Sequence, residues 1–239
     1  LDEAELTLPP FLEDFKNGNL KRVYRSSGFC DLGQTPIPSW DLIRMKKYAS
    51  LSIQFSRGCP FNCDFCNVTI LFGRKPRMKT AQQVIAELDS IYDTGWRGNI
   101  FFVDDNFIGN KGKLKREILP AIVKWMEKRK NPFYLNTEVS INLADDKELV
   151  HLMVKAGFEA VFIGIETPND ESLIECNKPQ NRNRDLIESV KKIQLAGLEV
   201  QGGFIVGFDN EIPTGALLLV SDQPMISTGV KTEASDAKI

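Results

Sequence analysis

The chain has 239 residues, enough for one large domain or two small ones, and its 42% hydrophobic and 26% charged residues are typical of a folded protein. The formal net charge of -2 argues against a nucleic-acid binder that depends on bulk positive charge. The single histidine excludes most zinc hydrolase sites, which use two or three imidazoles, and the odd number of five cysteines excludes a complete intrachain disulfide framework.

Residues 1–48 are predicted to form a linker or N-terminal arm, because they contain several prolines and no sustained hydrophobic periodicity. Short helices are compatible with the sequence near Phe11–Phe15 and Trp40–Lys46. The first ten residues are acidic and lack the basic region that precedes the apolar stretch of an export signal. No apolar run approaches the roughly 20 residues of a membrane-spanning helix. We therefore expect a cytoplasmic protein with reduced thiols and no membrane span.

From Leu51 onward, apolar strand patterns alternate with amphipathic helix patterns. Thr80 and Gln83 form a capping-box pattern at the start of the first helix. Pro120 should kink the second helix or mark its start, and Asp145 with Glu148 is expected to cap the third. The expected strands are 51–55, 99–103, 133–141, 160–165 and 200–206, and the expected helices are 80–94, 114–128, 145–156 and 184–196.

This alternation predicts a parallel α/β sheet with right-handed crossovers. Each of three helix ends is followed by glycine and then a strand, at Gly95, Gly157 and Gly197. Five strands in series favour a (β/α) TIM-like barrel or part of one over residues 49–209. A doubly wound sheet is the alternative, which the absence of a G-x-G-x-x-G motif disfavours. Residues 210–239 show no periodicity and are expected to form an irregular tail.

Three cysteines, Cys59, Cys63 and Cys66, follow the first strand directly. The carboxyl ends of the strands form the active face of a parallel barrel, so the cysteines fall where chemistry is expected. Three thiolates in one tight loop can hold three corners of a 4Fe-4S cluster and leave one iron open. A structural zinc site is the alternative, with Cys30, Cys176 or His151 as the fourth ligand.

The pattern C-x-x-x-C-x-x-C with Phe65 before the last cysteine resembles the signature of the radical S-adenosylmethionine (SAM) superfamily. The wider sequence is similar to the branch that carries a cobalamin-binding domain and includes the hopanoid C-2 methylase. The similarity rests on residues 54–61, 72–77, 103–110, 137–144 and 203–209. The resemblance implies a partial radical SAM barrel of about five strands that stops early on its C-terminal side. Two departures are the absence of a D-x-H-x-x-G cobalamin motif and of a recognisable sixth strand.

The resemblance also implies site residues. Cys59, Cys63 and Cys66 would hold the cluster, and Phe65 would help to seat the adenine of SAM. A second set of residues at later strand ends would contact SAM: Asp104, Asp105, Glu138, Ser140, Glu166, Gly203 and Gly207. Ordinary structural roles stay open for this second set, namely turn caps, inward polar residues and packing glycines. The sequence also lacks the Gly-Gly-Glu motif that many family members carry where Asp104 and Asp105 stand.

Three functions remain open. The first is the core of a cobalamin-dependent methyltransferase that uses a 5′-deoxyadenosyl radical to methylate an unactivated carbon, with cobalamin on a domain outside this chain. The second is a radical SAM enzyme of another reaction type without cobalamin, and the third is an inactive cluster-binding module. The resemblance implies a small-molecule or lipid substrate and an electron donor such as flavodoxin or ferredoxin, with no nucleic-acid partner.

Five basic residues surround the cysteines in the sequence: Arg57, Arg74, Lys75, Arg77 and Lys79. Two explanations are open for them. They can form a solvated surface run, or they can provide a basic environment for an anionic cluster, for the SAM carboxylate or for an acidic substrate.

Overall fold

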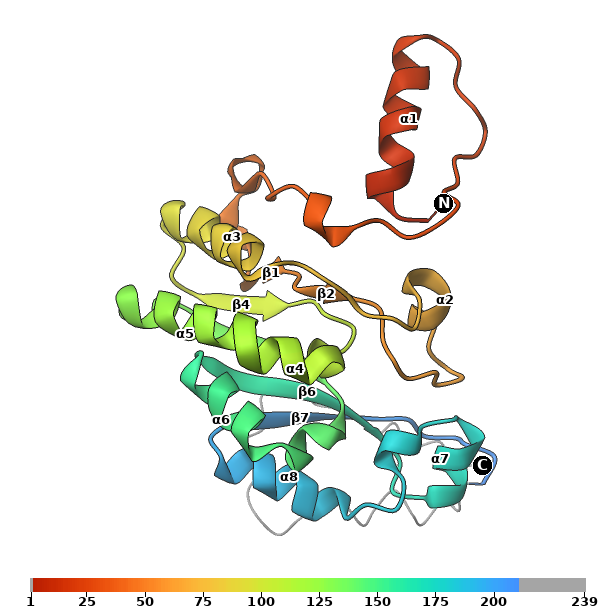
Figure 1. The fold of residues 1–239 in the computed structure, drawn as a ribbon. Coiled ribbons are helices and arrows are strands. Elements are labelled where there is room, and N and C mark those ends of the chain that lie inside the picture. The colour runs from red at the N-terminus through yellow and green to blue at the C-terminus, as the bar shows by residue number, and fades with distance from the viewer. Residues whose placement is uncertain (1, 211–239) are drawn as a thin grey trace, which may run out of the picture.

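The structure is a computed structural model and describes residues 2–210. The tail expected over 210–239 therefore lies outside the described residues, apart from Asn210. Five parallel strands form one sheet in the order β1-β4-β5-β6-β7 (Figure 1). Each strand lies beside the next one of the series, as in a barrel, without the reversal of order that defines a doubly wound sheet. The predicted α/β fold with five parallel strands is confirmed.

The strands of the main sheet are β1 (Ser50–Ile53), β4 (Asn99–Phe102), β5 (Tyr134–Val139), β6 (Phe158–Glu166) and β7 (Glu199–Phe204). A small antiparallel pair joins β2 (Ser56–Arg57) to β3 (Arg77–Met78). The α-helices are α1 (Ala4–Lys16), α2 (Val68–Phe72), α3 (Ala81–Asp93), α4 (Lys111–Lys113), α5 (Leu119–Lys128), α6 (Lys147–Lys155), α7 (Asp170–Glu175) and α8 (Leu186–Leu195).

Helices α3, α5, α6 and α8 bury one face of the sheet. Alternate strand residues such as Ile53, Ile100 and Val161 point into this core. A group of phenylalanines fills its centre, with ring centroids 5.1–5.8 Å apart: Phe55, Phe102, Phe107 and Phe158. The opposite face carries Asn136, Glu138 and Phe162, which line a shallow pocket of about 200 Å³. That face corresponds to the interior of a barrel.

The helix starts agree with the sequence at α3 and differ at α6. Thr80 and Gln83 form the predicted capping box of α3. At α6 the cap is Asp146 and not Asp145, because the Asp146 carboxylate accepts the Leu149 N–H while Asp145 pairs with Arg184. Pro120 lies in the first turn of α5, after a π-helical turn over Leu114–Ile118. The helical backbone already begins at Lys111, so Pro120 does not mark the start of the helical segment; the irregularity expected at the proline is the π-helical turn that precedes it.

The N-terminal residues differ from the prediction in two places: the first helix is longer than expected, and the second expected helix is absent. Helix α1 extends over Ala4–Lys16 and stands apart from the sheet (Figure 1). Its two prolines are tolerated in a helix that packs little against the core. The segment expected to form a helix at 40–46 instead contains two 3-10 turns, Trp40–Leu42 and Met45–Lys47. The other 3-10 turns are Leu32–Gln34, Phe107–Asn110, Ile141–Asp145 and Pro179–Asn181.

The three helix-to-strand connections are built alike, as the sequence indicated. Gly95, Gly157 and Gly197 have φ values of 88°, 93° and 106°. This left-handed conformation ends a helix and costs glycine least, because glycine has no Cβ. Each connection therefore returns the chain to the amino end of the next parallel strand, and all five carboxyl ends meet at the opposite edge of the sheet.

Candidate functional site at the carboxyl edge of the sheet

The three clustered cysteines lie in one loop, which we call the cysteine loop (residues 58–76), between β2 and β3. Cys59, Cys63 and Cys66 are free and half-buried. Gly58 opens the loop with a φ of 98°, and a Cβ at this position would lie 2.8 Å from the Gly73 oxygen. The Cys59 N–H donates to that same oxygen at 3.3 Å. Backbone thus packs on backbone at the entrance of the loop, and only glycine fits there.

The three thiols of the cysteine loop do not meet at a single point. Within residues 2–210, no three side chains of His, Cys, Asp or Glu converge on one metal position. In a 4Fe-4S cluster each thiolate binds a different iron, so the thiols need not meet at one point. Burial raises the pKa of Cys59 and of Cys63. Cluster binding would therefore release protons from these thiols.

Asp104 and Asp105 follow β4 and fix the backbone that leads into the cysteine loop. The Asp104 carboxylate is buried and accepts hydrogen bonds from the Phe55 N–H at 3.0 Å, from the Ser56 N–H and from the Ser56 hydroxyl at 2.6 Å. Burial raises the pKa of Asp104 to about 7, although the bonds from Ser56 and Phe55 oppose the change. Asp105 accepts from the Gly58 N–H at 2.7 Å. With three donors already in place, Asp104 holds the backbone, whereas Asp105 is half-buried and accepts this one hydrogen bond.

Glu138 and Ser140 come from the end of β5. Burial raises the pKa of Glu138, and the neighbouring Asp105 charge raises it further. These two carboxylates thus lie close enough to repel each other. Ser140 is tied to Asn106, whose Nδ2 donates to the Ser140 hydroxyl at 3.2 Å. Asn106 follows β4, so this bond connects the ends of β4 and β5.

Glu166 ends β6 in a left-handed conformation with a φ of 63°. Its buried carboxylate pairs with the Lys178 ammonium. Lys178 also lies 5.6 Å above the centre of the Phe65 ring. Phe65 itself is 46% exposed. The structure therefore brings the predicted residues Glu166 and Phe65 together through a lysine that the sequence did not single out.

The segment after α7 is a further neighbour of the cysteine loop that the sequence did not indicate. The Asp64 N–H donates to the Cys176 carbonyl at 3.0 Å, and the Asn177 amide donates to the Asn62 carbonyl at 2.7 Å. The Gln180 Nε2 lies 3.7 Å from the Cys63 sulfur as a donor. These residues are more than 100 positions from their partners, so no local sequence pattern could reveal the contacts.

The two predicted glycines of the last strand differ. A Cβ at Gly203 would lie 2.6 Å from the Phe162 ring, so a side chain there would have to displace that ring. Gly207 has a φ of 105° and open space where a Cβ would project. It follows β7 at the same edge of the sheet as the cysteine loop. Contact of either glycine with a cofactor stays a prediction.

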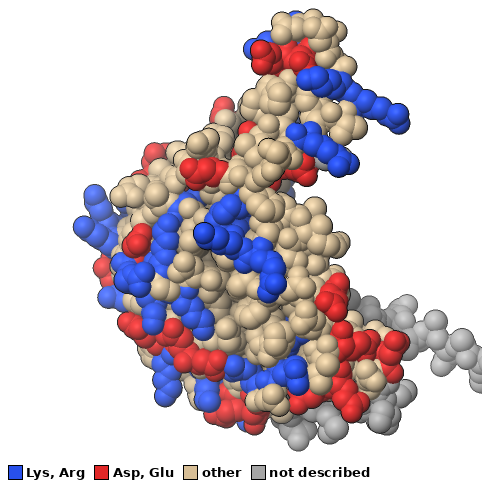
Figure 2. Space-filling view, turned by 45° about the vertical axis from the view of Figure 1, so that its right-hand side comes forward, with Lys and Arg blue, Asp and Glu red and all other residues tan. Residues whose placement is uncertain are grey.

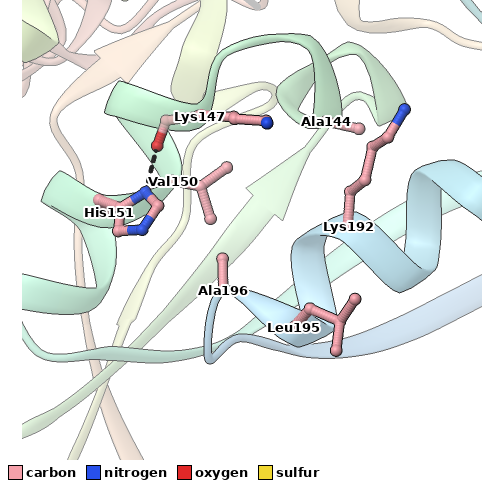
Figure 3. Close-up of a pocket in the computed structure, with 7 residues that line it drawn as sticks. All are labelled: Ala144, Lys147, Val150, His151, Lys192, Leu195 and Ala196. Carbon is pink, nitrogen blue, oxygen red and sulfur yellow. Dashed lines mark hydrogen bonds between the residues drawn. The ribbon is translucent and has the colours of Figure 1, made fainter.

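His151 lies on the outer side of the barrel. It lines a pocket of about 280 Å³ between α6 and α8, with Lys147 and Lys192 (Figure 3). Its Nδ1 bonds to the Lys147 carbonyl at 2.6 Å, one helical turn away. Cys30 is buried beside the guanidinium of Arg77, with a sulfur-to-nitrogen distance of 3.6 Å. Neither residue joins the three clustered thiols.

The basic residues around the cysteines separate into two groups. Arg57, Arg77 and Lys79 are largely buried and paired with the carboxylates of Glu3, Glu5 and Glu87. Arg74 and Lys75 are exposed. Side chains of both signs appear on the face shown in Figure 2. The explanation as a solvated surface run therefore applies at most to Arg74 and Lys75.

Comparison with known proteins places these features in a family. The Radical SAM superfamily profile matches residues 53–213. An uncharacterized methyltransferase from Synechocystis sp. is 50% identical over 211 residues, which are 88% of this chain and 39% of the relative. The hopanoid C-2 methylase of Rhodopseudomonas palustris is 37% identical over 219 residues, 91% of this chain and 41% of the relative. The chain thus spans about two fifths of the length of these curated relatives.

The fold is similar to that of a solved enzyme. A solved cobalamin-dependent SAM radical enzyme, OxsB with aqua-cobalamin and SAM bound, superposes with a TM-score of 0.70 at 21% identity. The match covers 85% of this chain and 32% of that enzyme. Within the described residues, no helix is both long and apolar enough to cross a bilayer. A family profile that matches most of the chain, over a five-stranded parallel sheet with its cysteines at the carboxyl edge, shows that the chain belongs to the radical SAM superfamily.

Proposed function

We propose that this chain is the core of a cobalamin-dependent radical SAM methyltransferase that methylates an unactivated carbon of a small-molecule or lipid substrate. The observation that carries the proposal is the loop of three half-buried thiols at the carboxyl edge of the sheet, whose first N–H, that of Gly58, is bonded to the Asp105 carboxylate. The names of the relatives, which include a hopanoid C-2 methylase, support methyl transfer. A cytoplasmic location and an electron donor of the flavodoxin or ferredoxin type stay predictions.

Cys59, Cys63 and Cys66 would hold a 4Fe-4S cluster, which when bound supplies the electron for reductive cleavage of SAM to a 5′-deoxyadenosyl radical. The chain's own residues provide a half-buried loop that limits the access of water to the cluster. Asp105 fixes the start of the loop by accepting a hydrogen bond from the Gly58 N–H. Phe65 offers an exposed ring at the rim, where it can stack on the adenine.

Asp105 and Glu138 are the proposed partners of the SAM ammonium group. Two neighbouring carboxylates repel each other, and a cation between them removes that repulsion and gains charge-assisted hydrogen bonds. Glu166, Ser140 and Gly207 would line the remainder of the SAM site. Glu166 would have to share or give up its bond to Lys178, because its carboxylate is already paired.

Anaerobic reconstitution with iron and sulfide tests the cluster. We expect the wild type to develop a broad absorbance at about 400 nm and the Cys63→Ala variant to lose it. Cys176→Ala is the matched control, because only the backbone of Cys176 bonds to the loop. A Cys63→Ala variant that kept a full cluster would overturn the ligand assignment.

Incubation of the reduced, cluster-loaded protein with SAM tests the reaction. Formation of 5′-deoxyadenosine is expected. A well-formed cluster that produced none would leave only the inactive binding module. SAM binding to Glu138→Gln should weaken about tenfold or more, since a charge-assisted bond is lost, whereas the exposed control Glu159→Gln should bind normally.

Cobalamin binding needs a separate test, because a domain outside this chain would hold the cobalamin. The adjoining coding sequence tests it directly. A cobalamin-binding domain encoded there supports methyl transfer from methylcobalamin. Its absence from the whole gene, together with 5′-deoxyadenosine formation by this chain, would favour a radical SAM reaction of another type.

A further inference from the structure

Two arginines face each other at the base of the cysteine loop. Arg57 and Arg77 are register partners in the antiparallel pair β2–β3, which closes the loop. Like charges directly opposite each other destabilise such a pair. The two side chains are only 14% and 18% exposed, so water screens their repulsion poorly. The closed loop therefore needs a negative charge between these two guanidiniums.

That charge comes from the N-terminal arm. The Glu3 carboxylate lies 3.0 Å from Arg57 Nη1 and 2.7 Å from Arg77 Nη2 through one oxygen, and 2.9 Å from Arg77 Nη1 through the other. Glu5 adds a second carboxylate, 2.9 Å from Arg57 Nη2. Glu3 itself is 4% exposed. Two carboxylates therefore neutralise two guanidiniums in a largely dry environment, where loss of one partner is costly.

The same network reaches the backbone of the loop. Arg77 Nη2 donates to the Phe72 carbonyl at 3.2 Å, next to Gly73, whose carbonyl accepts from the Cys59 N–H. On the arm side, Arg77 Nη1 donates to the Cys30 carbonyl at 2.8 Å, and the Cys30 N–H donates to Glu3 at 2.6 Å. Glu3 is thus connected to the first cysteine of the loop through Arg77 and two consecutive carbonyl groups.

We propose that the N-terminal arm holds the cysteine loop closed, with Glu3 as a positioning residue for the proposed cluster. The inference rests on the proposed function only for what the loop binds, since the contacts belong to the chain itself. Glu3 lies outside residues 53–213, the part that matches the superfamily. Among the described residues of that part, no carboxylate pairs with Arg57 or Arg77, and the arm supplies both of the carboxylates that do.

Glu3→Gln is the informative variant, because it keeps the shape of the side chain and removes the charge. Arg57 keeps Glu5, so Arg77 becomes the unpaired cation. In the cluster-free protein, amide hydrogen exchange over residues 58–76 should become about tenfold faster or more. In the reconstituted protein, a chelator should remove iron faster by a similar factor. Glu13→Gln, exposed on α1, the helix that follows Glu3, is the matched control and should leave both rates unchanged.

A compensating variant separates charge repulsion from simple loss of packing. Adding Arg77→Gln to Glu3→Gln removes the unpaired cation, so slow exchange in the loop should be partly restored. Two results would overturn the proposal: equal exchange in Glu3→Gln and Glu13→Gln, or faster exchange throughout α3 as well as in the loop. Failure of the wild type to assemble a cluster would count against the proposed function only, because the exchange measurement needs no cluster.

Discussion

At the scale of single residues, the site depends on a few positions where contacts with the backbone determine which residue type fits. Gly58 turns the chain into the cysteine loop, and Asp104 receives the N–H groups of Phe55 and Ser56 at the end of β1. Both residues stand in stretches that the sequence comparison with the superfamily singled out. Their roles follow from contacts between β1, β4 and the loop, which the sequence alone could not supply.

Gly58→Ala should destabilise the protein more than Gly95→Ala. Both glycines have positive φ, so alanine at either position costs about 1–2 kcal/mol. At Gly58 the new Cβ would also meet the Gly73 oxygen at 2.8 Å, whereas nothing lies within 4 Å at Gly95. Urea unfolding of the two variants measures the difference. Equal losses would show that the loop backbone relaxes freely.

Asp104→Asn tests the buried carboxyl group. In this variant the Nδ2 group, a hydrogen-bond donor, replaces a carboxylate oxygen that accepted a hydrogen bond, so two donors face each other. The free energy of unfolding at pH 7 should therefore fall by about 2 kcal/mol. The pKa of Asp104 is about 7 in the folded protein and 3.8 for an ordinary Asp. The folded state therefore binds the proton more tightly, and wild-type stability should fall as the pH rises from about 4 to about 7. Urea unfolding between about pH 4 and about pH 7 measures this fall in the unfolding free energy. The part of the fall that comes from Asp104 should be absent in Asp104→Asn.

At the scale of elements, local patterns determined most of the helices, and tertiary partners determined where some begin. The capping box of α3 was predictable because both of its partners lie within four residues. The start of α6 was not, since Asp145 and Asp146 are both good capping residues. Arg184, 39 positions later, pairs with Asp145 and leaves Asp146 as the cap.

Thr80→Ala should cost about 1 kcal/mol, because it removes the acceptor for the Gln83 N–H at the start of α3. Gln82→Ala, at an exposed position in the same turn, is the control and should be nearly neutral. Chemical unfolding of both variants provides the comparison. A Thr80→Ala loss no greater than that of the control would show that packing alone sets this helix start.

At the scale of the whole molecule, the arm and the barrel are joined by buried charge. Burial alone would raise the pKa of Glu3, but hydrogen bonds from Arg77, the Cys30 N–H and Arg57 together lower it to about 2. A carboxyl with a depressed folded pKa adds stability above its unfolded pKa of 4.5, and that stability is lost as the pH falls toward 2. The arm therefore binds the barrel most strongly near neutral pH.

The difference in unfolding free energy between wild type and Glu3→Gln should accordingly depend on pH. It should be full above about pH 5 and shrink steadily toward pH 2, as the wild-type carboxyl becomes protonated. Urea titrations at several pH values measure it, with Glu13→Gln as the reference variant. A difference that stayed constant down to pH 3 would show that Glu3 acts by shape and not by charge.

The sequence by itself determined the α/β class, the five parallel strands, the repeated glycine connections and the position of the three cysteines. These features depend on short-range periodicity and on a local motif, which a linear chain displays directly. The resemblance to the radical SAM superfamily, now confirmed by comparison, also needed no structure.

Only the tertiary structure decided how the site residues divide their work. In the structure, Asp104 accepts hydrogen bonds from the backbone and Glu166 pairs with Lys178. Residues 176–181 lie against the cysteine loop. The fold also joins Glu3 to Arg57 and Arg77, which are 54 and 74 positions away. Buried charges must find partners wherever the fold brings them, and those partners have no fixed spacing along the chain.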